Sequence, residues 1–189
     1  MRVTVTDIPR EWLGGNEARN TWVLQPFTST RDVDETTLSR TQAQAAKALI
    51  DSNLFGGKKP AARALPTPLD RTGGVVLVFA GKGRQRTAEN LRRAAALACK
   101  CLEANKARRA IVARGSLRDA EAAAFTEGFI LAAYRFDQYK SREGREDEEH
   151  SLEQVLFATP EGRGRNVLET AVTRAAVIAE GANAARRLG

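Results

Sequence analysis

The sequence predicts an α/β domain with a mixed sheet and helices on both faces. Short runs of apolar and β-branched residues alternate along the chain with longer segments of helical periodicity, an order typical of α/β proteins. One run, residues 75–80, is apolar throughout, as expected for a strand covered on both faces. Residues 2–8 instead alternate polar and apolar side chains, which suits a half-buried, antiparallel strand and favours a mixed sheet over a parallel one.

The predicted elements of the first third are two strands and a helix. Residues 2–8 form the first strand, which ends at Pro9 because proline cannot donate a ladder hydrogen bond. The mainly apolar residues 21–27 form the second strand. Asp34 is then expected to cap a helix over residues 35–52, where apolar side chains recur at helical spacing.

The middle of the chain predicts three strands around one long helix. A short edge strand at 62–65 lies in a segment too rich in proline and glycine for a helix, and the buried strand at 75–80 follows it. Thr87 caps a helix that reaches about Lys106. Residues 110–113 form another short buried strand.

The last third predicts two helices and one strand. Ser116 is the expected N-cap of a helix that reaches Phe136, with Asp119 at its third position. A strand at 152–158 and a final helix at 167–188 complete the series.

Composition excludes several protein classes. The chain has 189 residues, 42% hydrophobic and 28% charged, which is ordinary for a globular domain. Its longest apolar run is far short of the about 20 residues that a spanning helix needs, so no membrane association is expected. The two cysteines, Cys99 and Cys101, cannot build a disulfide framework. A reducing cytoplasmic location is therefore expected.

The net charge of +7 is concentrated in one block of the chain. Residues 58–114 contain 14 Lys and Arg against three acids, which gives +11 for the block and −4 for the remainder. Such a block would attract nucleic acid if its side chains converged in space. No aromatic residue interleaves it as a base-stacking platform, so a solvated face is the favoured interpretation.

The residue inventory offers no catalytic set. The single histidine, His150, excludes a histidine-based triad and a multi-histidine metal site. Cys99 and Cys101 point to different faces of their predicted helix, unlike zinc ligands. The adjacent acids at 147–149 suit a solvated run better than a two-metal carboxylate site. We therefore expect no catalytic residue, metal ligand or cofactor in this chain.

One turn has features of an anion site. It follows the strand at 75–80 and contains Gly81, Lys82, Gly83, Arg84 and Arg86. Glycines let the backbone approach a phosphate, and the amides of a helix N-terminus attract anions. The turn lacks the spacing of a P-loop or a dinucleotide fingerprint, so a plain strand-to-helix connection is favoured over phosphate binding.

Four segments match the pattern of a known family in the same order. They are 51–66, with Phe55-Gly56-Gly57-Lys58; 75–82; 128–141; and 176–186. The most specific part is the signature Tyr134, Arg135, Phe136, Asp137, Tyr139 and Lys140. From about residue 34 onward the chain resembles the N-terminal domain of the leucyl (cytosol) aminopeptidases.

The resemblance implies a macro-domain-like, three-layer α/β/α fold over residues 1–165 and, at 166–189, a helix that links to a peptidase domain. In the family that second domain holds two divalent metals, zinc or manganese, and the catalytic arginine. No position of this chain can inherit those roles. A truncated chain is favoured over a stand-alone relative of the domain.

The resulting expectation is a non-catalytic domain of a cytoplasmic enzyme that removes N-terminal residues, often leucine, from peptides. Its partners would be its own peptidase domain and other copies in a hexamer, and its role would be oligomer assembly and control of active-site access. The alternative is a macro-like module that binds ADP-ribose or nucleic-acid phosphates through Gly81-Lys82-Gly83 and the basic block. Some relatives bind DNA, which would give that block a use.

Overall fold

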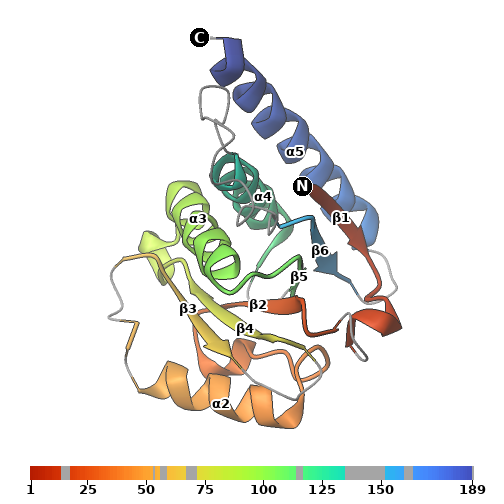
Figure 1. Cartoon of the computed structure of the whole chain (residues 1–189). Coiled ribbons are helices and arrows are strands. Elements are labelled where there is room, and N and C mark those ends of the chain that lie inside the picture. Colours follow the sequence, from red (N-terminus) through yellow and green to blue (C-terminus); the bar gives the residue numbers. More distant parts are fainter. Residues whose placement is uncertain are drawn as a thin grey trace, which may run out of the picture.

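The computed structural model describes residues 1–13, 18–52, 54–55, 59–66, 72–113, 117–134, 152–159 and 164–188. Within them lies a six-stranded sheet of order β1-β6-β5-β2-β4-β3 (Figure 1). Its strands are β1 (Arg2–Thr6), β2 (Thr21–Phe27), β3 (Ala61–Pro66), β4 (Gly74–Phe79), β5 (Arg109–Val112) and β6 (Gln154–Ala158). Only β3 runs antiparallel to its neighbour, so the predicted mixed sheet is confirmed.

The antiparallel strand is not the one that the sequence pattern indicated. β1 pairs with β6 in parallel and lies at the edge of the sheet. Of its side chains only Val5 is fully buried. The alternation of polar and apolar residues at 2–8 therefore reflects an edge position with one covered face, while β3 at the opposite edge supplies the antiparallel pairing.

Helices cover both faces of the sheet, as the three-layer prediction requires. They are α2 (Arg40–Asp51), α3 (Ala88–Ala104), α4 (Asp119–Ala133) and α5 (Arg165–Leu188), with short 3-10 turns η1 (Arg10–Leu13), η2 (Thr30–Asp32) and η3 (Gly83–Gln85). Helices α3, α4 and α5 pack on one face and α2 on the other (Figure 1). Among the described helices none is long and apolar enough to cross a membrane.

Strand β4 shows why one apolar run fits this architecture. Val76 and Val78 join the core beneath α3 and α4, whereas Val75 and Leu77 join the core beneath α2. Each side of the strand is thus buried, and every residue of β4 is inaccessible to solvent. The aromatic side chain of Phe79 extends the second core.

Helix α2 starts later than predicted. Ser39, rather than Asp34, is its N-cap: the Ser39 hydroxyl accepts a hydrogen bond from the backbone N–H of Gln42 at 3.1 Å, and the Gln42 side chain accepts one from the Ser39 N–H. Asp34 instead closes a turn by accepting from the backbone N–H of Thr36 at 2.9 Å. Both residues can cap a helix, and the reciprocal bonds of the capping box favour Ser39.

Helix α3 has the predicted cap, because the Thr87 hydroxyl accepts from the N–H of Asn90 at 3.2 Å. Helix α4 differs from the prediction at both ends. It begins at Asp119 after the N-cap residue Arg118, so Glu121 rather than Asp119 stands at the third position. It ends at Ala133. The predicted cap Ser116 and the predicted end Phe136 lie outside the described residues.

Helix α5 packs along α4 and the edge strand β1. The side chains that face this contact are Leu168, Val172, Ala175, Ala179 and Asn183. The C-terminal end of α5 reaches beyond the strands to the tip of the molecule (Figure 1).

Candidate functional site

The turn between β4 and α3 is built on two glycines with positive φ. The φ angles are 100° at Gly81 and 53° at Gly83, which glycine adopts without strain. A Cβ on Gly81 would also lie 2.9 Å from the carbonyl oxygen of Gln85. The amides of Gln85 and Arg86 donate to the carbonyls of Lys82 and Gly83, each at 3.1 Å. These amides stabilise the turn itself and are not directed at an external anion.

The three cations of the turn have different surroundings. Lys82 and Arg84 are exposed. The Arg86 side chain is largely covered and forms a two-pronged ion pair with Glu121: Nε lies 2.9 Å from Oε1, and Nη2 lies 3.2 Å from Oε2. The exposed fractions of the two side chains are 9% and 7%. Arg86 therefore neutralises an internal carboxylate, and anion binding at residues 81–84 stays a prediction.

Glu121 is held as a carboxylate by its arginine partners. Burial raises its pKa, but hydrogen bonds from Arg86 and Arg118 outweigh burial and bring the pKa down to about 2. The charge of Arg86 also contributes to the lowered pKa of Asp32, where burial acts in the opposite direction and hydrogen bonds from Thr28 act in the same direction. Arg86 thus interacts electrostatically with an acid at the start of α4 and with an acid in the loop after β2. Glu121 could have been found from the sequence as the acid three residues after the helix cap. It was missed because Ser116, rather than Arg118, was expected to be that cap.

Several cations of the basic block are likewise paired with acids from outside it. The pairs are Arg86–Glu121, Arg92–Glu127 and Arg108–Glu153. The acids come from α4 and from the residues before β6, far away in the sequence. The exposed positive charge of the block is consequently lower than its sequence count of +11 indicates.

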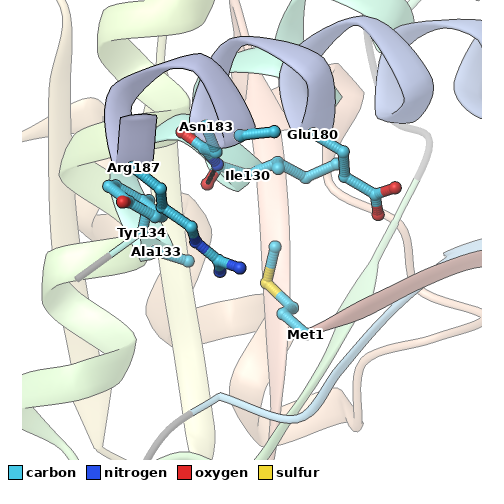
Figure 2. A pocket seen from close by; sticks show the side chains of 8 residues that line it. Met1, Ile130, Ala133, Tyr134, Glu180, Asn183 and Arg187 are labelled. Atoms are coloured by element: carbon cyan, nitrogen blue, oxygen red, sulfur yellow. Dashed lines mark hydrogen bonds between the residues drawn. The ribbon is translucent and has the colours of Figure 1, made fainter. Parts of the chain in front are cut away.

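A groove of about 430 Å³ lies between the C-terminal parts of α4 and α5 (Figure 2). Its lining residues are Met1, Ile130, Ala133, Tyr134, Glu180, Asn183, Ala184 and Arg187. The Arg187 guanidinium lies over the Tyr134 ring, 5.5 Å from the ring centroid. Asn183 Nδ2 donates to the carbonyl oxygen of Ile130 at 3.2 Å, which satisfies a buried acceptor in the last turns of α4. Both contacts fix α5 against α4.

The groove lies where two of the resemblance segments meet: residues 128–134, the described part of the first, which end α4, and residues 176–186 on α5. Gly128 has a structural role, because a Cβ there would lie 2.3 Å from the carbonyl oxygen of Arg92 on α3. Of the predicted signature, Tyr134 lines the groove. The other signature residues, Arg135, Phe136, Asp137, Tyr139 and Lys140, lie outside the described residues.

The part of the chain that the structure describes contains no group of three His, Cys, Asp or Glu side chains that could hold a metal ion. Cys99 is buried in the core beneath α3, and Cys101 is half-buried against the same core. His150 lies outside the described residues. The described residues therefore offer no donor set for the two zinc or manganese ions that the resemblance implies for a peptidase domain.

Comparison with known proteins gives a consistent result. Residues 28–143 match the model of the cytosol aminopeptidase family, N-terminal domain. A probable cytosol aminopeptidase of Aquifex aeolicus (strain VF5) is 32% identical over 154 residues, which cover 80% of this chain and 29% of that protein. A probable cytosol aminopeptidase of Methylorubrum populi (strain ATCC BAA-705 / NCIMB 13946 / BJ001) is 43% identical over 74 residues, 39% of this chain and 14% of that protein. The chain spans less than a third of the length of these relatives.

Solved structures share the fold. A tomato leucine aminopeptidase mutant superposes with a TM-score of 0.62 and 17% identity, covering 95% of this chain and 36% of that chain. The bottromycin maturation enzyme BotP in complex with Mn gives a TM-score of 0.57 at 22% identity, covering 90% and 32%. At these identities the likeness establishes the α/β architecture and no site.

Proposed function

Because the chain belongs to the cytosol aminopeptidase family as its N-terminal domain, we propose that it is the non-catalytic part of a longer, metal-dependent enzyme that removes N-terminal residues from peptides. The observation that carries the proposal is the family match over residues 28–143 in a chain that covers 29% of the Aquifex relative. In the proposed enzyme a peptidase domain follows α5 and binds two zinc or manganese ions. The division at about residue 165 into domain and linking helix is part of the proposal.

The role that we propose for this domain is architectural. It would fix contacts within an oligomer, a hexamer as the resemblance implies, and limit access to the active site of the peptidase domain, in the cytoplasm. The support within the chain is the joint between α4 and α5, where the Asn183 hydrogen bond and the Arg187–Tyr134 contact hold the linking helix to the domain. A helix held in this way transmits the position of one domain to the next.

Two assays test the proposal. The purified 189-residue chain, supplied with Mn²⁺ or Zn²⁺, should not hydrolyse leucine p-nitroanilide. A chimera in which this chain replaces the N-terminal domain of the Aquifex aeolicus enzyme should hydrolyse it and assemble into an oligomer in light scattering. The isolated peptidase domain of that enzyme is the control. EDTA-sensitive turnover by this chain alone, or a chimera no better assembled or more active than the control, would contradict the proposal.

The alternative function, recognition of ADP-ribose or nucleic-acid phosphate, finds no favouring observation at the turn after β4. The amides of Gln85 and Arg86 have internal carbonyl partners, and the Arg86 side chain pairs with Glu121. We therefore make no second proposal.

A further inference from the structure

Strand β1 forms an open edge of the sheet (Figure 1). It stands first in the strand order, and the strand beside it is β6. The N–H of Arg2 donates at 2.8 Å to the residue just before β6. Since successive residues of a strand turn their backbone groups to opposite sides, Thr4 and Thr6 also face β6. The N–H and C=O groups of Val3 and Val5 therefore point outward, to a side on which no other described strand lies.

A groove of about 460 Å³ runs along this edge. It is lined by the five residues of β1, by Gln154 of β6, and by Glu169, Val172 and Thr173 of α5. The backbone edge thus borders a hollow beside α5. Outward backbone groups at a sheet edge are a template on which another strand can pair.

The two edges of the sheet differ in their protection against such pairing. The opposite edge strand, β3, ends with Pro66, which has no N–H, and carries the exposed charge of Arg63 at its middle. Proline and charged residues are the usual devices that keep edge strands from pairing. The middle of β1 has neither, because Val3-Thr4-Val5 is uncharged and consists of residues that favour strands. Strand β1 is therefore the edge suited to accept a further strand.

The charges at the two ends of β1 favour a second copy of the chain as the partner. Arg2 is exposed at the start of the strand, and Asp7, just after its end, has 51% of its side chain exposed. An antiparallel second β1 brings the basic start of each strand against the acidic end of the other. One guanidinium already spans this acidic end, since Arg165 lies 3.3 Å from the Thr6 hydroxyl and 4.0 Å from the Asp7 carboxylate. An arginine opposite Thr6 would therefore lie within reach of Asp7.

The outward backbone groups select the register. Pairing Val3 with Val5 of the second copy joins their N–H and C=O groups in reciprocal hydrogen bonds. It also places Arg2 opposite Thr6 and Thr4 opposite its own copy on a two-fold axis. The Thr4 hydroxyl is inaccessible to solvent and has no hydrogen-bond partner among the described residues. Opposed threonines in an antiparallel pair can bond each other, so this register would give the hydroxyl a partner.

We propose that two copies of this chain pair through β1 in antiparallel orientation, with Thr4 on the two-fold axis, and join their sheets into one. The inference names a contact for the oligomer assembly proposed above and rests on the proposed function to that extent. The paired strands are short, so the dimer should be reversible and dissociate on dilution.

Cysteine cross-linking tests orientation and register together. In a background of Cys99→Ala and Cys101→Ser, Thr4→Cys should form a disulfide-linked dimer on oxidation with copper phenanthroline. The reason is that opposed residues of such a pair lie about 4.5 Å apart between Cα atoms. Thr6→Cys is the matched control, because its counterpart would be about 14 Å away along the strand, at about 3.4 Å per residue. Equal cross-linking of the two variants, or of neither, would overturn the proposal.

Charge reversal gives a second readout, measured by sedimentation velocity over a range of concentrations. Arg2→Glu and Asp7→Lys should each weaken the association by about 3- to 10-fold, because like charges then meet at both ends of the pair. The double variant should regain much of the loss. Arg63→Glu on β3 is the matched control, since it changes the net charge as Arg2→Glu does, and should associate as the wild type. Single variants that associate like the control, or a double variant as weak as either single one, would contradict the proposal.

The chimera with the Aquifex peptidase domain separates this inference from the proposed function. Thr4→Cys should cross-link in the chimera and Thr6→Cys should not. An active, assembled chimera without the Thr4→Cys cross-link would overturn the inference, assign the edge to another occupant such as the peptidase domain, and leave the function intact. A cross-linked Thr4→Cys chimera without activity would support the pairing and refute the function.

Discussion

The buried ion pair between Arg86 and Glu121 should make a large part of the stability of this domain depend on one carboxylate. Each pKa unit corresponds to about 1.4 kcal/mol. Lowering the pKa of Glu121 from 4.5 to about 2 therefore stabilises the folded state by about 3 kcal/mol at neutral pH. Glu121→Gln removes the charge but keeps the shape, and leaves Arg86 buried without its carboxylate. We expect the variant to lose about 3 kcal/mol, as is typical when one partner of a buried pair is removed.

The pH dependence has a definite sign. Because the pKa of Glu121 is lower in the folded state, its stabilisation is complete above the unfolded value of 4.5 and is lost as the pH falls towards about 2. The protonated carboxyl resembles the amide of the variant. The difference between wild type and Glu121→Gln should consequently fall to about 2 kcal/mol near pH 3.5 and about 1 kcal/mol near pH 2.5.

Urea unfolding followed by tryptophan fluorescence or circular dichroism at several pH values measures both quantities. Glu89→Gln is the matched control, because Glu89 pairs with Arg93 at 2.8 Å on the exposed surface of α3. Such a pair contributes about 0.3–0.5 kcal/mol, with little change on acidification. A Glu121→Gln variant as stable as the Glu89→Gln variant, or a difference from wild type that stays constant down to acid pH, would refute the reasoning.

Three further substitutions test the helices, each by urea unfolding of the chain alone. Gly128→Ala should destabilise the domain by about 1–3 kcal/mol, because its Cβ would lie 2.3 Å from a backbone oxygen of α3. The control Gly181→Ala should stabilise it by up to about 1 kcal/mol, because that site is open. A loss of stability at both positions would contradict the packing. Asn183→Ala should cost about 1–3 kcal/mol by leaving a buried carbonyl of α4 without a donor, and a neutral effect would show that water replaces the amide. Ser39→Ala should cost about 1 kcal/mol through loss of the α2 cap, with Asp34→Ala expected to leave the helix content of α2 unchanged.

The elements that the sequence predicted best are those whose signals are local. The continuous apolar run of β4 follows from burial on both faces, and the cap at Thr87 follows from one hydroxyl and one amide three residues apart. Neither depends on the rest of the chain. The fold class followed from such elements because strands and long helices alternate.

The errors arose where tertiary contacts decide. Asp34 and Ser39 both have the chemistry of a helix cap, and the choice depends on Gln42, whose side chain bonds both Ser39 and the distant Thr72, at 2.9 Å from the latter. The direction of β1 was mistaken because an edge strand in a parallel sheet can show the same alternation as an antiparallel strand. The periodicity of apolar residues predicts local structure, but it does not show which distant strand or side chain a residue will contact.

The candidate site shows the same limit. The sequence grouped Arg86 with Lys82 and Arg84 because they are neighbours in the chain, but the partner that decides its role is Glu121, 35 residues away. The grouping of basic residues into one block overlooked the acids of α4 for the same reason. Positive charge in a sequence predicts a binding surface only where the fold leaves that charge unpaired.

The two helical glycines show what the structure adds to a family resemblance. Gly128 and Gly181 both lie in segments that resemble the family, and from the sequence alone they are equivalent. In the structure Gly128 is required by the close approach of α3, whereas a Cβ added at Gly181 would meet nothing within 4 Å. The resemblance by itself therefore does not distinguish a glycine that the packing of this domain requires from one that it does not.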